Sequence, residues 1–214
     1  MKKAIAVVLI ACVALGFAFA SKSSDIKIGA QLGFGGMNYR FANPNSPSDT
    51  YLNANLGGFK FAGTAEYQFS DALSARAELG MNFISFAKSV ECVAGYPPHH
   101  YEPENNPGAH FIIYLGAQYN LELTKEINLG LGAGFDVLMG LLENTDKDSF
   151  NAGMGLAAEA VGSYAINKNI SINLGGKFAW HFFNTSDDYK EMVDMGMKVC
   201  NLAYQFFAGA TYAL

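Results

Sequence analysis

Eight ionisable residues share a sequence pattern that would gather them in one narrow space. Each lies on the polar face of a segment in which polar and apolar residues alternate, and alternate residues of a strand point to opposite sides. Charges enclosed together must pair or be hydrated. Three chemistries are then open: a salt-bridge network that closes the space, a gate in which exchange of partners opens a narrow ion path, and paired carboxylates for acid–base catalysis. These residues are Lys60, Arg76, Glu78, Asp136, Glu159 and Lys177, together with Glu66 and Glu122.

An apolar set continues the same register toward one end of these segments. Apolar side chains above a charged floor are unusual for a water-filled pore but would suit a pocket for a hydrophobic small molecule. The alternative is that they only pack the upper part of the fold, and a one-residue slip at a bulge would turn them to the opposite face. The set is Ile84, Phe86, Ile112, Tyr114, Leu138 and Phe183.

Cysteine and histidine offer weaker sites. Cys92 and Cys200 are an even pair, which in an exported protein favours a disulfide over a zinc site shared with distant histidines. The adjacent His99 and His100 supply two metal ligands without a close third, so we expect a rigid, exposed aromatic loop rather than a metal centre. His110 and His181 have inward parity but no partnering serine.

No motif of covalent catalysis or phosphate binding supports an enzyme. We find no nucleophile motif, and the glycines at 130, 132 and 134 lie inside a predicted strand rather than at a strand-to-helix turn. The sequence therefore predicts a protein without enzymatic activity, cofactor or metal.

The elements that position these residues are eight predicted strands. Three short polar turns, at 70–72, 124–126 and 167–169, alternate with four longer connections, at 42–52, 88–108, 142–151 and 185–198. Short turns at one end and long loops at the other are typical of outer-membrane barrels, whose short turns are periplasmic. The predicted strands are 26–41, 53–69, 73–87, 109–123, 127–141, 152–166, 170–184 and 199–214.

The two faces separate clearly in the seventh strand. Leu174, Phe178 and Trp180 share one face, whereas Asn173, Lys177 and His181 share the other. Apolar-out and polar-in is the arrangement of a membrane barrel, in which closure of the sheet satisfies every edge hydrogen bond. In the first strand the glycines between 29 and 36 blur the two faces and permit a bulge or kink.

Composition and the N-terminus place the chain outside the cytoplasm. Residues 1–20 resemble an export signal, with Lys2 and Lys3 before an apolar run and Ala18-Phe19-Ala20 as the cleavage pattern. Acylation of Cys12 in a lipoprotein signal is the alternative. Without the two lysines, 12 basic and 19 acidic residues leave a formal charge of −7, which disfavours nucleic-acid binding. Charged residues are 15% of the chain, against about 25% in typical soluble proteins.

Residues 21–214 resemble the small eight-stranded outer-membrane proteins of the OmpW-like, OmpX-like and opacity-protein kind. The closing stretch Tyr204–Leu214 resembles the terminal strand that the barrel-assembly machinery reads, with Tyr212 and Leu214 at outward positions, although it ends in Leu rather than an aromatic residue. For OmpW-like proteins the resemblance implies a hydrophobic trough with lateral exit to the bilayer. Some eight-stranded barrels are lipid-modifying enzymes.

These observations predict an all-β fold, an eight-stranded antiparallel up-and-down transmembrane β-barrel formed by residues 21–214. We expect it in the outer membrane of a diderm bacterium, with long loops extracellular and with short turns and both termini periplasmic. The predicted function is a narrow channel or a binding trough for small hydrophobic molecules. The alternative is a surface adhesin or host-interaction protein that acts through its loops. The expected partners are membrane lipid, a hydrophobic solute and host surface molecules.

Overall fold

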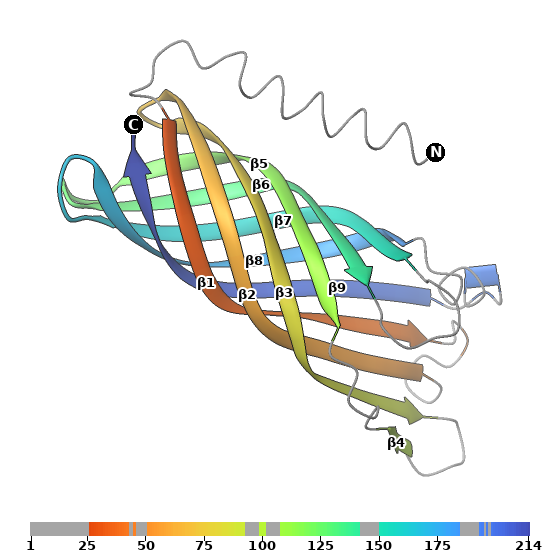
Figure 1. The fold of residues 1–214 in the computed structure, drawn as a ribbon. Coiled ribbons are helices and arrows are strands. Elements are labelled where there is room, and N and C mark those ends of the chain that lie inside the picture. The colour runs from red at the N-terminus through yellow and green to blue at the C-terminus, as the bar shows by residue number, and fades with distance from the viewer. Residues whose placement is uncertain are drawn as a thin grey trace.

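The computed structural model describes residues 26–42, 45, 51–92, 99–101, 108–141, 150–184, 193–194, 196 and 198–214. Eight long antiparallel strands close into a barrel, because each pairs with its two neighbours along the chain and β9 pairs with β1 (Figure 1). The strands are β1 (Ile26–Ala42), β2 (Tyr51–Ser70), β3 (Leu73–Cys92), β5 (Ala109–Glu122), β6 (Ile127–Leu141), β7 (Phe150–Ala165), β8 (Ile170–Asn184) and β9 (Lys198–Ala213). The predicted fold class is confirmed.

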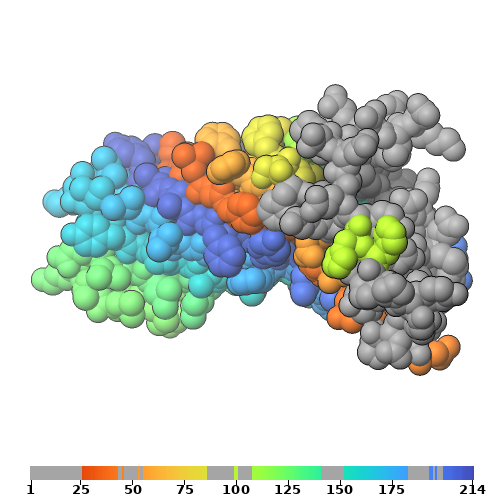
Figure 2. Space-filling view, turned by 90° about the horizontal axis from the view of Figure 1, so that it is seen from below, coloured from red at the N-terminus to blue at the C-terminus, as the bar shows by residue number. Residues whose placement is uncertain are grey.

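One connection differs from its prediction. Residues 88–108 were expected to form a loop, but β3 continues to Cys92, and the short strand β4 (His99–Tyr101) pairs with β3 at Ser89–Glu91. Figures 1 and 2 show β4 at one end of the barrel. The opposite end is the one where β1 begins at Ile26 and β9 ends at Ala213. We call that end the loop end, and the end with the three short turns the turn end. The predicted signal sequence, residues 1–20, and with it Cys12, lies outside the described residues.

The strand register defines the geometry of the barrel. Following paired residues once around the wall from Ile28 returns to β1 at Asn38, ten residues further along. At about 3.3 Å per residue and about 4.8 Å between strands, this offset corresponds to a strand tilt of about 40°, within the usual range for barrels. The path runs through Ala65, Ala77, Leu115, Phe135, Leu156, Trp180 and Leu202.

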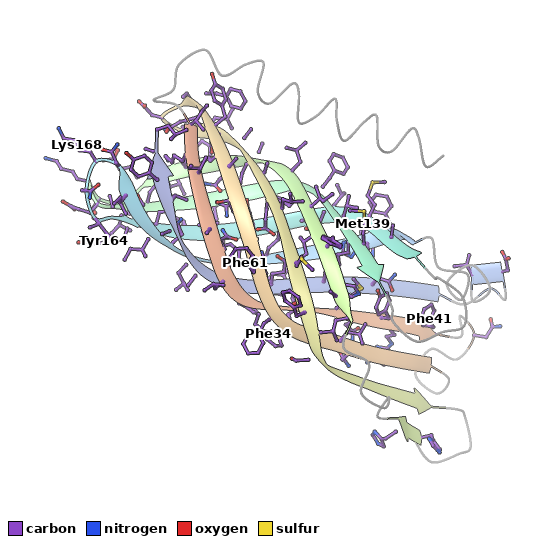
Figure 3. The ribbon with its side chains drawn as sticks, viewed as in Figure 1. Phe34, Phe41, Phe61, Met139, Tyr164 and Lys168 are labelled. Atoms are coloured by element: carbon purple, nitrogen blue, oxygen red, sulfur yellow. The ribbon has the colours of Figure 1, made fainter. Side chains whose placement is uncertain are left out.

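Apolar side chains cover the outside of the barrel. Leu174 and Phe59 are both 71% exposed and Phe61 is 54% exposed, and Figure 3 shows Phe34 directed away from the barrel. Tyrosines on the outer face near the turn end include Tyr164, also visible in Figure 3. Within the described residues no helix is long and apolar enough to cross a membrane. Lipid contact on this face is favourable at about 25 cal/mol per Å² of apolar surface, whereas the inner face carries most of the buried polar residues.

Three register shifts interrupt the strand pairing, and none lies in the glycine-rich first strand. β1 pairs with β2 and β9 without a register shift. One shift leaves Phe69 unpaired beside the turn between β2 and β3, and the other two leave Ser85 unpaired opposite Gly57 and Gly58, and Phe182 unpaired opposite Met154 and Gly155. A side chain at Gly58 would collide with the backbone oxygen of Phe83. Glycine is therefore required there for the close approach of β2 and β3.

Candidate functional site in the barrel lumen

The predicted charges meet in the middle of the lumen. Lys177 is the hub, because its Nζ lies 2.7 Å from Asp136 Oδ1 and donates to Glu78 Oε1 at 3.1 Å. Lys60 Nζ lies 2.8 Å from the same Glu78 oxygen. The lysines are at most 2% exposed, and β2, β3, β6 and β8 each contribute one of these residues. The structure thus brings residues far apart in sequence into one continuous chain of ion pairs, from Lys60 through Glu78 and Lys177 to Asp136.

Arg76 and Glu159 form a second, looser arm of this cluster. Arg76 Nε lies 3.4 Å from Glu159 Oε1, but neither atom has a hydrogen-bonding geometry with a partner among the described residues. The Gln31 amide, with its oxygen and nitrogen assigned so that both are satisfied, accepts from Arg76 and donates to Glu78 Oε2 at 3.1 Å. We call six of these residues the lumen charge network: Lys60, Arg76, Glu78, Asp136, Glu159 and Lys177. It has three cations and three carboxylates, so its formal charge is balanced.

The other two predicted charges form no ion pair with the network among the described residues, although Glu66 is the cross-strand partner of Arg76. Glu66 is 3.5 Å from Lys27 near the turn end, and Glu122 lines the same region. Both border a cavity of about 430 Å³ whose lining is mostly amide, hydroxyl and charged side chains, including those of Gln118 and Asn173. Residues of two short turns also line it, so this cavity lies on the turn side of the network.

An apolar layer occupies the lumen on the loop side of the network. Ile112 and Tyr114 are each 1% exposed, and Leu138 packs with them in one cluster. Met37 and three inward alanines complete the cluster, and Tyr39 packs against it. Ile84 is buried at the same end, so four of the six predicted apolar residues lie buried in this part of the lumen. In this structure the protein's own side chains fill the layer.

The two phenylalanines that were predicted to line the pocket, Phe86 and Phe183, occupy outward rather than inward positions in the strand pairing. The bulge at Ser85 pairs Phe86 with Gly57, which shares the parity of the outward Phe59. The bulge at Phe182 likewise pairs Phe183 with Met154, whose side chain is 40% exposed on the outer face. One extra residue exchanges the inward and outward positions of all residues that follow it in the strand. The alternation before each bulge therefore does not predict which face the residues after the bulge occupy. The side chains of Phe86 and Phe183 lie outside the described set.

The predicted disulfide is not formed in the structure, where Cys200 is a free, exposed thiol. Cys92 pairs with Tyr51, Tyr51 with Ala42 and Ala42 with Lys198, so three interstrand steps separate β3 from β9. At about 4.8 Å a step the wall distance is about 14 Å. A disulfide requires Cα atoms within about 7 Å.

The four histidines occupy two places in the structure. Among the described residues no group of three or more His, Cys, Asp or Glu side chains is arranged to hold a metal ion. His99 and His100 are exposed on β4. His181 is buried and its Nε2 lies 3.2 Å from Asp136 Oδ2, which extends the chain of polar contacts from the network into the apolar layer. His110 is buried near the same end.

The sequence interpretation missed several residues that complete the site. Gln205 accepts a hydrogen bond from Lys60, and the Phe207 ring lies 4.8 Å from the same ammonium nitrogen. Lys177 similarly lies 4.5 Å from the Tyr114 ring centroid. Gln31 and Met37 were missed because the glycines of β1 obscure the polar–apolar alternation of that strand. The inward parity of β9 could have identified Gln205 and Phe207.

Comparison with known proteins agrees with this architecture. No curated protein sequence matches the chain. Among solved structures, Neisserial surface protein A is 14% identical with a TM-score of 0.57, covering 89% of this chain and 98% of that one. OprG from Pseudomonas aeruginosa is 13% identical with a TM-score of 0.48, covering 87% and 94%. Ail of Yersinia pestis, solved with the heparin analogue sucrose octasulfate, is 12% identical with a TM-score of 0.45, covering 88% and 98%.

The family of the chain follows from the profile that matches it. The profile described as "Outer membrane protein beta-barrel domain" matches residues 4–208, almost the whole chain. The closed eight-stranded barrel with an apolar outer face is the fold expected of that family. This chain belongs to the outer-membrane β-barrel family.

Proposed function

We propose that the protein is a closed barrel whose extended loop end serves as a binding surface outside the cell. The observation that carries this proposal is the filled lumen. The buried lumen charge network and the apolar layer next to it occupy the cross-section, and an eight-stranded barrel is only wide enough for its side chains. Function then has to reside on a surface, and exposed loops on a rigid scaffold are where binding concentrates.

The lengths of the strands support the same proposal. β2 and β3 each have 20 residues, whereas about 9–11 tilted residues cross the hydrocarbon core. About ten residues of each strand therefore remain, and at the loop end β4 adds a further strand to β3. The resulting platform carries the exposed His99 and His100. Extracellular loops and periplasmic termini are part of this proposal.

A second candidate is the predicted trough for small hydrophobic molecules. The observation in its favour is that Ile84, Ile112, Tyr114 and Leu138 are all buried on the inner face. A solute would have to displace Met37, which packs in the same cluster. Entry would therefore require an opening movement of the loop end.

One pair of experiments separates the two candidates. The refolded barrel is tested for planar-bilayer conductance with and without a hydrophobic solute, and intact cells that display it are tested for adhesion to immobilised matrix proteins and sulfated glycans. A binding surface predicts silence in the bilayer and adhesion that disappears when 93–107 is replaced by a Gly/Ser segment of equal length. The proposal would be rejected in favour of the trough if the barrel shows discrete conductance that the solute blocks and if replacement of 93–107 leaves adhesion unchanged.

The matched control for the loop replacement is a lumen variant. Ile112→Trp places extra volume in the apolar layer without changing any residue outside the barrel wall. We expect it to leave adhesion unchanged. If it abolishes adhesion while the barrel remains folded, the binding surface is not confined to the loop end.

A further inference from the structure

The outer face of the barrel changes character on one side near the loop end. On β1 and β2, the outward positions beyond the aromatic side chains are occupied by Asn38, Arg40, Asn53 and Asn55 rather than by apolar residues. Asn38 pairs with Asn55, and Arg40 pairs with Asn53. All four share the parity of outward residues such as Leu32 and Phe59, which are 65% and 71% exposed. The outer face therefore carries a polar patch on this side, just before the outermost outward pair, Ala42 and Tyr51.

The amide groups of the patch are linked to one another. Asn38 Nδ2 donates to Asn53 Oδ1 and to Asn55 Oδ1, both at 2.6 Å. These bonds engage the oxygens of Asn53 and Asn55, and the NH₂ group of each is a further donor in a patch that also contains the exposed Arg40. Amide and guanidinium donors together suit an anion with several oxygen acceptors, such as a phosphate.

Further cations follow at the same level. The pairing rows climb ten residues over eight strands, or 1.25 residues per strand. Lys88 pairs with Asn55, and Lys198 pairs with Ala42. When the offset of 1.25 residues per strand is taken into account, both lie within about one residue of Arg40 along the barrel axis. Both positions have outward parity, because Lys88 lies opposite outward Asn55 and Lys198 is two residues from the exposed Cys200.

Among the described residues the opposite wall has no counterpart. The ends of β5–β8 near the same level contain neither lysine nor arginine. Their outward residues are apolar, as the partly exposed Phe111, Met154 and Phe182 show. The segments concerned are 109–111, 139–141, 150–154 and 182–184.

We propose that Arg40, Asn53 and Asn55, with the positions of Lys88 and Lys198 on either side, bind the phosphorylated headgroup of a lipid in the leaflet around the loop end. The site lies directly beyond the aromatic band of the same strands, so the acyl chains of that lipid would lie against Phe34 and Phe59. Phe41, the neighbour of Arg40, marks this end of β1 in Figure 3. Because the cations lie on one side only, the headgroup would bind to the part of the wall formed by β9, β1, β2 and β3.

The test uses the refolded full-length barrel in nanodiscs or neutral detergent. Bis-phosphorylated lipid A is the probe, the same lipid without its phosphates is the reference, and native mass spectrometry measures Kd. We expect Arg40→Gln to raise Kd for the phosphorylated lipid about 5-fold, and addition of Lys88→Gln to raise it about 20-fold in total. Arg40→Lys should stay within about 3-fold of the unmodified protein because it keeps the charge.

The control is Lys168→Gln, which removes an exposed cation from a turn at the opposite end (Figure 3). It should leave Kd unchanged within about 2-fold, and heat-modifiable migration on gels verifies that each variant is folded. Equal Kd for the unmodified barrel and Arg40→Gln would overturn the proposal. So would equally tight binding of the dephosphorylated lipid, which would show that only acyl chains are recognised, or displacement of lipid A by millimolar inorganic phosphate, which would show a general anion site.

Discussion

Removal of the Lys177 ammonium tests whether the lumen charge network is a dry structural plug. In Lys177→Met the side chain keeps its length, but Asp136 and Glu78 each lose a cationic partner, at 2.7 Å and 3.1 Å. At an effective dielectric constant of about 20, each contact near 3 Å is worth roughly 5 kcal/mol before desolvation is subtracted. Because Lys60 still pairs with Glu78, we expect a net loss of about 3–5 kcal/mol, the range for breaking a buried pair.

The assay is equilibrium unfolding in urea of the barrel refolded into lipid vesicles, with the free energy of unfolding compared between variants. Asp136→Asn added to Lys177→Met removes the carboxylate that is left without a lysine partner, and we expect it to restore a large part of the loss. The matched control is Lys27→Met, because Lys27 pairs with Glu66 at 3.5 Å but its side chain is 32% exposed. An exposed pair should cost at most about 1 kcal/mol.

The comparison between the two lysines decides the argument. If Lys177→Met costs no more than Lys27→Met, water reaches the network and compensates the carboxylates. The filled lumen would then be the wrong basis for the proposed function. Bilayer conductance of the same variant gives a second check, since a hydrated network should pass ions once its central cation is removed.

Three further predictions concern the wall. Lysine at Leu131 or Leu174, both on the outer face, should destabilise the barrel by about 2–4 kcal/mol in vesicles; no loss at either position would mean that the face assignment is wrong. Trp180 is the single tryptophan and is 53% exposed on the outer face, so brominated acyl chains should quench its fluorescence strongly, whereas quenching only by aqueous acrylamide would contradict lipid contact. Cys200 is free and exposed at the loop end, so a membrane-impermeant maleimide should label intact cells; labelling only after lysis would reverse the proposed orientation.

Much of the wall was predictable because strand periodicity is local. In β8, the alternation that placed Leu174 outside and Lys177 inside needs only that successive side chains point to opposite faces. The turns at 124–126 and 167–169 were recognisable from their own residues. The eight inward charges were found in the same way, and the six of the network do meet.

Which residues touch was decided only by closure of the barrel. Lys177 reaches both Asp136 and Glu78 because the pairing rows climb ten residues per circuit, and that offset is a property of eight strands together rather than of any one. Glu66 instead lies near Lys27 because the two residues are direct partners in the pairing of β1 with β2.

The bulges mark the limit of what the sequence by itself determined. Alternation correctly placed Ile84 on the inner face, but one extra residue at Ser85 and another at Phe182 moved Phe86 and Phe183 to outward register. A bulge exists only relative to a partner strand, so no pattern within β3 or β8 alone reveals it. The sequence determined the type of barrel and its two faces through local periodicity, whereas the tertiary structure decided register, pairing and the contents of the lumen through contacts between distant strands.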